Sequence, residues 1–436
     1  MHKLRAWIIE QRANYHELIN MSIVAVVAHL AYGTLNLSAI PPYVVMRGWQ
    51  PYIGDIYATF LVAETLMRSP MGSLGDWIGR RPVYVTIGII GAASAFAWTI
   101  VHALWMIFAV RAVDGAVSGG LWTTTIVAMG GTVKKESRTM AMGTFIVTLL
   151  TGIALGPIIG GFVNEATDSK ITSFYAASAM FLLAALLAMR LIPVRMTDQK
   201  EGPPKEKQNI KRIFSGVVFG MKSIPDYIAM AIVIYIPIGM VIPIAKLFSM
   251  QELHMTEVEY GLMFLAGGLL LAVVSIGSGR LTKIWGKAKS VHLGFILAAG
   301  MMYTIALIHI YWLTVVFAGI IALGFVIALP AWLARVSDLA APEVRGSVMG
   351  ALGAGQGVGL IAGVLFGGYM YNSVSFNFFG EKLQPHYTPF LISAFGLTIG
   401  AVLSLLFVKE NDPRQFTETD LEHMENSSKT DQQNHS

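Results

Sequence analysis

Long apolar runs alternate with short polar stretches along almost the whole chain. A helix that crosses the hydrocarbon core of a bilayer needs about 20 mainly apolar residues. About twelve runs meet this requirement, in two sets of six: 20–46, 52–74, 82–101, 104–130, 138–163 and 172–192, then 226–249, 256–282, 288–309, 311–336, 344–371 and 387–408. Hydrocarbon offers no partners to unpaired backbone groups, and the runs are too long for barrel strands. The pattern therefore predicts an all-α membrane protein with about twelve transmembrane helices in two pseudo-symmetric six-helix bundles.

The polar stretches that flank and separate the two sets predict the domain organisation. Residues 1–19 carry mixed charges and lack a small-residue cleavage site, so we expect a retained cytoplasmic N-terminal segment. The two bundles are expected at 20–192 and 226–408. Between them, 193–225 is rich in lysine and arginine and predicts a cytoplasmic linker, part of which has the apolar spacing of a surface-lying helix. The polar tail, 409–436, is expected to be disordered and cytoplasmic.

Composition and charge agree with a membrane protein. Of the 436 residues, 55% are hydrophobic and 13% are charged, whereas a soluble domain has about a quarter charged residues. The formal net charge of +5 does not indicate a nucleic-acid partner, because the basic residues fall mostly between apolar runs. They collect on the side that holds both termini, so the positive-inside rule predicts cytoplasmic termini. We expect a multi-pass protein of the bacterial cytoplasmic membrane. The chain has no cysteine, which excludes disulfides.

An internal repeat with an offset of 207 residues runs through the sequence. A charged motif from Gly72 to Arg81 has a weaker copy from Gly279 to Lys287. The same offset aligns further residues: His102 with His309, Trp105 with Trp312, Glu136 with Glu343, Arg138 with Arg345, and Gly152, Gly156, Gly160 and Gly161 with Gly359, Gly363, Gly367 and Gly368. Two six-helix halves in one orientation place a site at their interface near mid-membrane and support alternating access.

These motifs resemble the major facilitator superfamily over nearly the whole chain. The stretch from Gly72 to Arg81 resembles its signature loop between helices 2 and 3, and Arg111 with Gly115 is similar to its second motif. Helix 5 resembles the motif of exporters that exchange solute for protons, with Gly143, Gly152, Gly156, Pro157, Gly160 and Gly161. The Pro41-Pro42 pair fits the twelve-helix drug–proton antiporter branch of the family. The second copy of the loop motif departs from the family pattern, because Lys283 stands at the position of the acid. The resemblance implies the major facilitator fold and proton-coupled export.

The first loop motif is expected to act as a gate. Its gating residues are Gly72, Asp76, Gly79, Arg80 and Arg81. The resemblance implies that this loop fastens the two halves in the outward-facing state, and Glu136 in the following loop is a candidate partner for Arg80. The alternative is a determinant of topology without a switching role. Asp76 favours the gate, because an acid contributes little to topology.

Two charged pairs lie inside apolar runs. Glu64 and Arg68 are four residues apart in the second run, and Arg111 and Asp114 are three apart in the fourth. Ionisable residues at membrane depth are costly and mark functional sites by default. Either carboxylate could carry a coupled proton, and the family resemblance gives Arg111 a role in that coupling. The alternative for each pair is a structural ion pair, with Arg68 as a brace for its helix.

Four further residues are candidates for the lining of a transport cavity: His29, Asn36, Trp122 and Trp332. The first run contains no acid, and His29 is its one side chain of a type whose unperturbed pKa lies near neutral pH. The two tryptophans lie within their runs, where they could stack on an apolar solute or pack against a neighbouring helix. The helix 5 glycines, with Pro157, are expected to allow close helix approach and local bending.

The sequence carries no constellation typical of an enzyme. It has neither a His-Glu-x-x-His zinc motif nor a nucleotide-binding P-loop, so no metal or cofactor is predicted. We therefore predict a monomeric secondary transporter that exports amphipathic or apolar small molecules in exchange for protons across the lipid bilayer. Two alternatives stay open: a lipid or glycolipid translocator of the same fold, and a non-transporting membrane sensor. The intact loop and the charges at membrane depth argue against the sensor.

Overall fold

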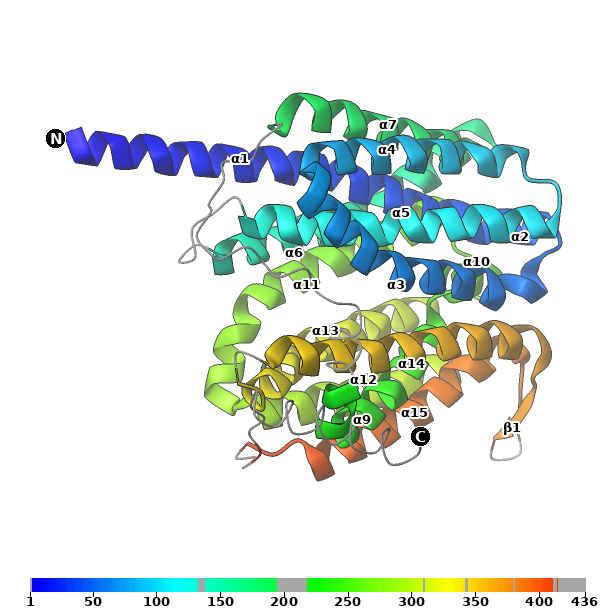
Figure 1. Cartoon of the computed structure of the whole chain (residues 1–436). Coiled ribbons are helices and arrows are strands. Elements are labelled where there is room, and N and C mark those ends of the chain that lie inside the picture. The colour runs from blue at the N-terminus through cyan, green and yellow to red at the C-terminus, as the bar shows by residue number, and fades with distance from the viewer. Residues whose placement is uncertain are drawn as a thin grey trace, which may run out of the picture. The chain divides into compact units, whose positions relative to one another are not determined.

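The structure is a computed structural model that describes residues 2–131, 138–193, 218–308, 310–341, 344–378, 381–410 and 414. The first part of the chain contains α1 (His2–Gly33), the π-helix η1 (Thr34–Ala39), α2 (Ile40–Met46), η2 (Gln50–Tyr52), α3 (Ile53–Ile78), α4 (Arg80–Ala97), η3 (Trp98–Ile100), α5 (Leu104–Gly131), α6 (Arg138–Thr167) and α7 (Thr172–Leu191). Figure 1 shows several of these helices running side by side.

The second part repeats this helical pattern with one addition. Its elements are α9 (Pro225–Val241), α10 (Ala245–Gln251), α11 (Glu257–Trp285), α12 (Lys287–Leu307), α13 (Tyr311–Asp338), α14 (Arg345–Ser373), β1 (Phe376–Phe378), β2 (Glu381–Leu383), η5 (Pro385–Tyr387) and α15 (Thr388–Phe407). The two strands form a short antiparallel hairpin in which Asn377 pairs with Lys382. This hairpin is a small departure from the predicted all-helical chain.

Ten helical segments among the described residues are long and apolar enough to cross a membrane. The two expected runs outside this group, 52–74 and 256–282, are occupied by α3 and α11, with 26 and 29 residues. At 1.5 Å per residue, each is longer than the roughly 30 Å of a hydrocarbon core. The predicted all-α membrane architecture is therefore confirmed.

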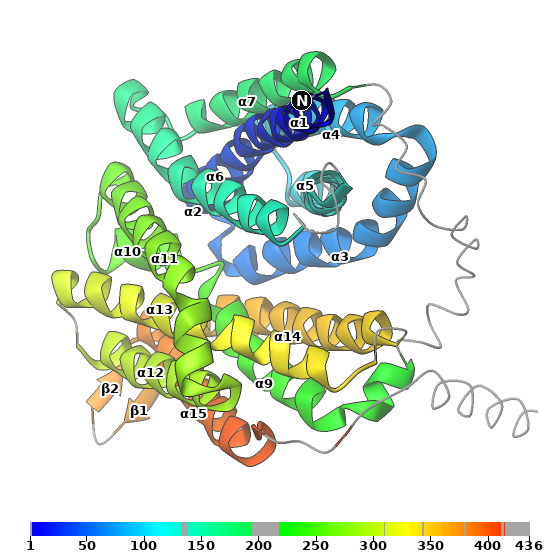
Figure 2. The same cartoon turned by 90° about the vertical axis from the view of Figure 1, so that its left-hand side faces the viewer.

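Packing divides the chain into two compact units. Unit 1 comprises Met1–Gln199 and Pro243–Ala272, and unit 2 comprises Lys200–Ile242 and Val273–Ser436. Within unit 1, α1 packs on α6, α3 on α5, and α4 on α7. Figure 2 looks along α5 and shows α1, α3, α4 and α6 around it. Within unit 2, α9 packs on α14 and α12 on α13. The bundle limits expected from the sequence stay predictions.

Glycines that the repeat aligns lie at equivalent helix contacts in the two units. A Cβ atom added to Gly156 of α6 would lie 2.5 Å from the Thr34 nitrogen at the end of the first helix of unit 1. A Cβ added to Gly363 of α14 would lie 2.2 Å from the Ile236 carbonyl oxygen of α9. Both distances are too short for any side chain, so the small residue allows each pair of helices to approach.

The two copies of the loop motif share one backbone conformation. Gly79, between α3 and α4, has φ 89° and ψ 161°, and Gly286, between α11 and α12, has φ 86° and ψ 159°. This region of backbone space is essentially restricted to glycine. The second copy therefore keeps the turn of the first, although Lys283 stands where the first has an acid.

Candidate functional site

Arg111 of α5 is fully buried, and the shortest contacts of its guanidinium are with neutral groups. Its Nη1 donates to Asn36 Oδ1 at 2.7 Å, and its Nε donates to the Ile56 carbonyl oxygen at 3.3 Å. Its Cζ lies 4.3 Å from the centroid of the Phe60 ring and 5.1 Å from that of the Tyr57 ring, within the range of cation–π attraction. The buried Nη2 has no hydrogen-bond partner among the described residues. The site therefore retains one unused donor.

Asp114, one turn further along α5, is also buried and accepts from three donors. Ser94 Oγ of α4 donates to Oδ1 at 2.6 Å, and Trp98 Nε1 of η3 donates to Oδ2 at 2.9 Å. Arg111 Nη1 reaches Oδ2 only at 3.5 Å, which is long for a hydrogen bond. The sequence-predicted pair is thus brought together, but two neutral donors make the shorter bonds to the carboxylate.

Asn36 lies on η1, the π-helical turn between α1 and α2. Such turns are rare and frequently occur at functional sites. The Tyr57 hydroxyl donates to the Asn36 carbonyl oxygen at 2.7 Å, and Asn36 Nδ2 donates to the Tyr32 carbonyl oxygen at 3.1 Å. The Tyr57 bond holds the backbone of Asn36, and the Nδ2 bond orients the side-chain amide so that its Oδ1 accepts from Arg111.

Glu64 and Arg68 of α3 form a second ion pair, with Arg68 Nη2 2.7 Å from Glu64 Oε1. The Glu64 side chain is 9% exposed, whereas that of Arg68 is 47% exposed. Arg68 Cζ lies 5.4 Å from the Trp122 ring centroid of α5. A Cβ on Gly119 would lie 2.4 Å from the Glu64 carbonyl oxygen, so glycine lets α5 approach this part of α3. The predicted ion pair is present, and the Trp122 ring contacts its arginine.

These two pairs have no charged counterparts in the second half of the repeat. The offset of 207 places Leu271, Ser275, Ala318 and Ile321 opposite Glu64, Arg68, Arg111 and Asp114. None of the four counterparts is ionisable. The halves therefore share a backbone plan but differ in their chemistry.

The loop motif is described in part. Arg80 Nη1 donates to the Ala128 carbonyl oxygen at 3.0 Å. Ala128 lies in the last turn of α5, where the helix dipole favours a cation. The side chain of Asp76 and the whole of Glu136 lie outside the described residues, so the pairing of Arg80 with Glu136 stays a prediction.

The glycines of the exporter motif lie on the contact faces of α6. Gly152, Gly156 and Gly160 meet α1 and η1. Thr34 Oγ1 donates to the Gly156 carbonyl oxygen at 3.0 Å, just before Pro157 inside the helix. Gly161 faces another partner: a Cβ there would lie 2.4 Å from the Glu257 carbonyl oxygen of α11. The expected close packing of this helix is therefore observed.

His29 and Trp332 are buried packing side chains in this structure. His29 Nδ1 lies 2.7 Å from the Ala25 carbonyl oxygen, one turn back in α1. The Trp332 ring lies in the core of unit 2, 6.1 Å from the Phe295 ring and 6.4 Å from the Tyr235 ring. Their role in lining a cavity stays a prediction.

Sequence reasoning missed one buried charged cluster in unit 1. Lys246 of α10 donates to the Ser38 carbonyl oxygen at 2.6 Å and to Glu257 Oε2 at 2.9 Å. Glu257 of α11 also accepts from Asn164 Nδ2 at 3.0 Å and from Lys170 Nζ at 2.5 Å. These five residues are named the Lys246–Glu257 cluster below. The two charges sit 11 residues apart on different helices, so the one available signal was a lysine inside an apolar run.

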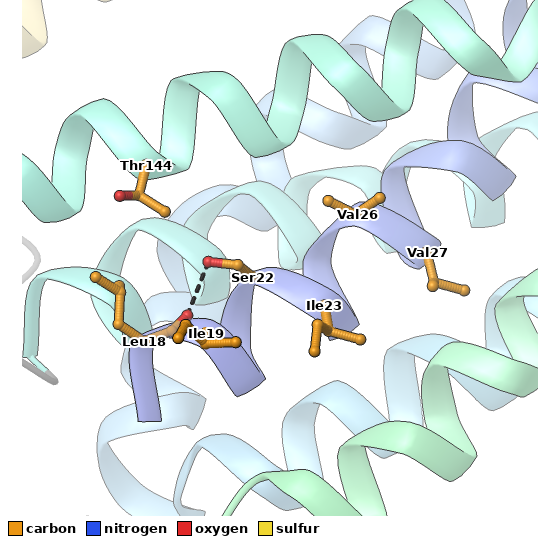
Figure 3. A pocket seen from close by; sticks show the side chains of 7 residues that line it. All are labelled: Leu18, Ile19, Ser22, Ile23, Val26, Val27 and Thr144. Carbon is orange, nitrogen blue, oxygen red and sulfur yellow. Dashed lines mark hydrogen bonds between the residues drawn. The ribbon is translucent and has the colours of Figure 1, made fainter. Parts of the chain in front are cut away.

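An apolar groove of about 540 Å³ lies along α1 (Figure 3). It is lined by Leu18, Ile19, Ser22, Ile23, Val26 and Val27 of α1 and by Thr144 of α6. The Ser22 hydroxyl donates to the Leu18 carbonyl oxygen at 2.7 Å, as Figure 3 shows, and so is already used within the helix. The groove therefore suits an alkyl or aromatic group.

Comparison with known proteins assigns the family. The sequence model of the Major Facilitator Superfamily matches residues 21–233 and 227–430. The chain belongs to the Major Facilitator Superfamily. The resemblance found in the sequence motifs is confirmed, and this Major Facilitator Superfamily chain is a multi-pass integral membrane transporter.

Bacterial members of the Major Facilitator Superfamily are similar to the chain over most of their length. Multidrug resistance protein 1 of Bacillus subtilis (strain 168) is 24% identical over 359 residues, which are 81% of this chain and 86% of that protein. Proton-coupled antiporter flippase LtaA of Staphylococcus aureus (strain USA300) is 23% identical over 367 residues, 82% of this chain and 88% of its own.

A solved structure shows the same fold. It is a bacterial homologue of the human lysosomal transporter Spinster, in an inward-facing and unoccupied conformation. The two structures superpose with a TM-score of 0.74 at 14% sequence identity, over 92% of this chain and 99% of that one. At this identity the likeness concerns the fold alone.

Proposed function

We propose that the chain exports amphipathic or apolar small molecules in exchange for protons, by alternating access. The observation that carries the proposal is the buried network of Arg111 and Asp114 within a membrane-spanning helix. An antiporter needs a group that takes up a proton on one side and releases it on the other. Charges at membrane depth are costly and mark such groups. Two relatives are named a multidrug resistance protein and a proton-coupled antiporter flippase, and both names agree with the proposal.

Asp114 is the proposed proton carrier because its surroundings tolerate both of its charge states. The Ser94 hydroxyl can donate to a carboxylate and can rotate to accept from a protonated acid. Arg111 keeps its short bond to Asn36 in either state. Protonation therefore leaves no buried cation without an acceptor.

Glu64 fits a structural role better. Its carboxylate is only 2.7 Å from the Arg68 guanidinium, and charge-assisted bonds of this length are about twice as strong as neutral ones. Protonation of Glu64 would weaken that bond and release Arg68, which also lies over the Trp122 ring. We therefore assign Glu64 and Arg68 to bracing α3 against α5.

The substrate class rests on the groove of α1. Its lining is almost entirely aliphatic, and the Ser22 hydroxyl bonds within its own helix. Apolar binding of this kind is set by shape and buried area and tolerates many solutes. Together these features favour solutes with a large apolar part.

Translocation of a lipid or glycolipid is the second candidate function. The groove follows α1 from Leu18 to Val27, about 15 Å at the helical rise, a length that suits an acyl chain. A relative named as a flippase supports this alternative. Buried charged pairs argue against a sensor that never changes state.

We also propose the orientation and the cytoplasmic gate. The distribution of lysine and arginine favours cytoplasmic termini and a cytoplasmic linker. The chain is proposed to act as a monomer in the bacterial membrane. The stretch from Gly72 to Arg81 would then form the cytoplasmic gate. The bond from Arg80 to the last turn of α5 attaches this loop to its own bundle.

The test is solute-driven proton movement in liposomes. The purified chain is reconstituted with a pH-sensitive dye inside, and gradients of lipophilic cations, neutral amphiphiles or a fluorescent lipid are imposed in turn. Proton movement driven by small amphiphiles supports export, and transfer of the lipid between leaflets supports translocation. Protein-free liposomes are the control. A silent dye with every compound would contradict proton coupling.

A further inference from the structure

The segment Pro243–Ala272 packs with helices of the first set, although the repeat assigns it to the second set. By the offset of 207 it corresponds to residues 36–65, so it belongs to the second set of helices. In the structure it is part of unit 1, whose other residues all come from the first set and its flanks. Its two buried charges, Lys246 and Glu257, both lie on this segment, and they bond across the contact to Ser38 and Asn164 of the first set.

Hydrogen bonds from three elements hold the segment. Lys246 Nζ reaches both the carbonyl oxygen and the hydroxyl of Ser38 on η1, at 2.6 and 3.1 Å. Glu257 accepts from Asn164 on α6 and from Lys170 in the connection that follows α6. Lys246 Nζ also lies 5.5 Å from the Tyr260 ring centroid. Every charge in the cluster is thus paired across or along this contact.

Close backbone contacts accompany the charges. A Cβ on Gly161 would lie 2.4 Å from the Glu257 carbonyl oxygen, and one on Gly261 would lie 2.6 Å from the Ile158 Cα atom. Glu165 Oε1 at the end of α6 accepts from the Val258 nitrogen in the first turn of α11 at 2.9 Å. A carboxylate at a helix N-terminus is favourable. The contact is therefore tight at the end of α6.

A buried ion pair of this kind suits a contact that opens and closes. Removing two charges from water costs about as much free energy as their attraction gains. Such pairs therefore contribute little net stability. When the contact opens, water can replace Ser38, Asn164 and Lys170 as partners of Lys246 and Glu257. When one partner is removed, the other charge is left buried and unpaired, which is strongly unfavourable. The closed contact thus requires both residues, while the open contact requires neither.

We infer that the Lys246–Glu257 cluster is the gate of the non-cytoplasmic side, and that it must separate for this side to open. It lies where α6 ends and α11 begins. Arg80 of the loop motif, at the start of α4, lies at the opposite end of the first bundle's helices by chain direction. Alternating access requires the first and second sets to part on that side. The gate needs neither an identified solute nor a coupled proton, so it goes beyond the proposed function.

The absence of cysteine makes accessibility the direct test. Ser249→Cys places one thiol on α10, where Ser249 is 5% exposed. In proteoliposomes without solute or proton gradient, we expect a membrane-impermeant maleimide to label it slowly. Adding Glu257→Gln or Lys246→Gln should raise the labelling rate about ten-fold, because the closed state loses its pairing and the open state becomes populated.

A second thiol separates opening from local unfolding. Ser22→Cys lies on α1 towards its proposed cytoplasmic end, and opening of the outer side should lower its labelling from the cytoplasmic side. Local unfolding around Glu257 would leave that rate unchanged. Asp226→Asn is the matched control, because it neutralises a carboxylate that is paired with Arg414 in unit 2 at 2.8 Å. It should change neither rate.

Lys170→Gln keeps the test valid if the two main variants fail to fold. Its side chain is 43% exposed, so its loss leaves the buried pair intact and should raise Ser249→Cys labelling by a smaller factor. Folded variants whose two labelling rates both equal those of the parent would overturn the gate. The labelling experiment involves neither solute nor proton gradient, so this result would not contradict the proposed export. A failure of the export test would likewise not contradict the gate.

Discussion

Arg111 lies closer to Asn36 than to Asp114: its Nη1 is 2.7 Å from Asn36 Oδ1 and 3.5 Å from Asp114 Oδ2. The nearest acceptor of this buried cation is a neutral amide on the π-helical turn η1. The carboxylate on its own helix is bound more closely by Ser94 and Trp98. Asp114 can therefore change its charge while Arg111 keeps its main partner.

Asn36→Ala tests this division of roles. Without the amide, Arg111 should turn to Asp114 and hold it as a carboxylate, so solute-driven proton movement should fall about ten-fold or more. Loss of one bond to a buried charge should also cost about 1–3 kcal/mol of stability. Dye-loaded liposomes and thermal unfolding measure the two effects. Thr59→Ala is the control, since that hydroxyl donates one turn back to the Asp55 carbonyl oxygen. Wild-type proton movement in Asn36→Ala would contradict the role of the amide.

Gly156→Ala tests the close approach of α6 to α1. The added Cβ would lie 2.5 Å from the Thr34 nitrogen, so the helices must separate, at a cost of about 1–3 kcal/mol for an overpacked contact. Thermal unfolding in detergent should show a lower Tm. Gly267→Ala is the matched control, because no atom of the described residues lies within 4 Å of a Cβ there. Equal Tm values for the two variants would refute the packing account.

Gly79→Ala and Gly286→Ala test the shared turn of the two loop copies. Alanine at φ near 90° should cost about 1–3 kcal/mol in each copy. At Gly286 a Cβ would also lie 2.9 Å from a Glu410 carboxylate oxygen, so this side chain must move. Glu410 accepts from the nitrogens of Lys287 and Ala288 and so caps α12. Unfolding curves compared with Gly319→Ala, a position with open space, provide the check.

Ile23→Trp tests the groove of α1 as the site for an apolar group. The larger side chain should fill part of the 540 Å³ groove and raise the KM for lipophilic solutes about ten-fold. Transport rates over a range of solute concentrations give the KM. Ile89→Trp is the control, because Ile89 is similarly exposed on α4 and does not line the groove. An unchanged KM in Ile23→Trp would place the solute elsewhere.

The architecture could be predicted because span length is a local property. A bilayer requires about 20 apolar residues per helix, and runs such as 104–130 and 172–192 have this length in the sequence itself. The repeat also carried real structural information, since Gly79 and Gly286 share a conformation and Gly156 and Gly363 share a type of contact. These properties depend on single residues and their spacing.

The partners of the charged residues could not be predicted in the same way. Spacing along one helix indicated the pairs of Glu64 with Arg68 and of Arg111 with Asp114, and both are present. It could not indicate Asn36, which reaches Arg111 from another helix through a π-helical turn. Lys246 and Glu257 were missed for the same reason, because their partners Ser38 and Asn164 are distant in sequence. The hairpin at 376–383 is too short to give a periodic signal.

The most direct test of the account compares Asp114→Asn with Glu64→Gln in the same liposomes. Two rates are measured for each variant: solute exchange at equal concentrations, which needs no net proton movement, and proton movement driven by a solute gradient. We predict that Asp114→Asn exchanges solute but no longer moves protons, and that Glu64→Gln retains both activities. Proton movement that persists in Asp114→Asn, or that is lost in Glu64→Gln instead, would contradict Asp114 as the proton carrier.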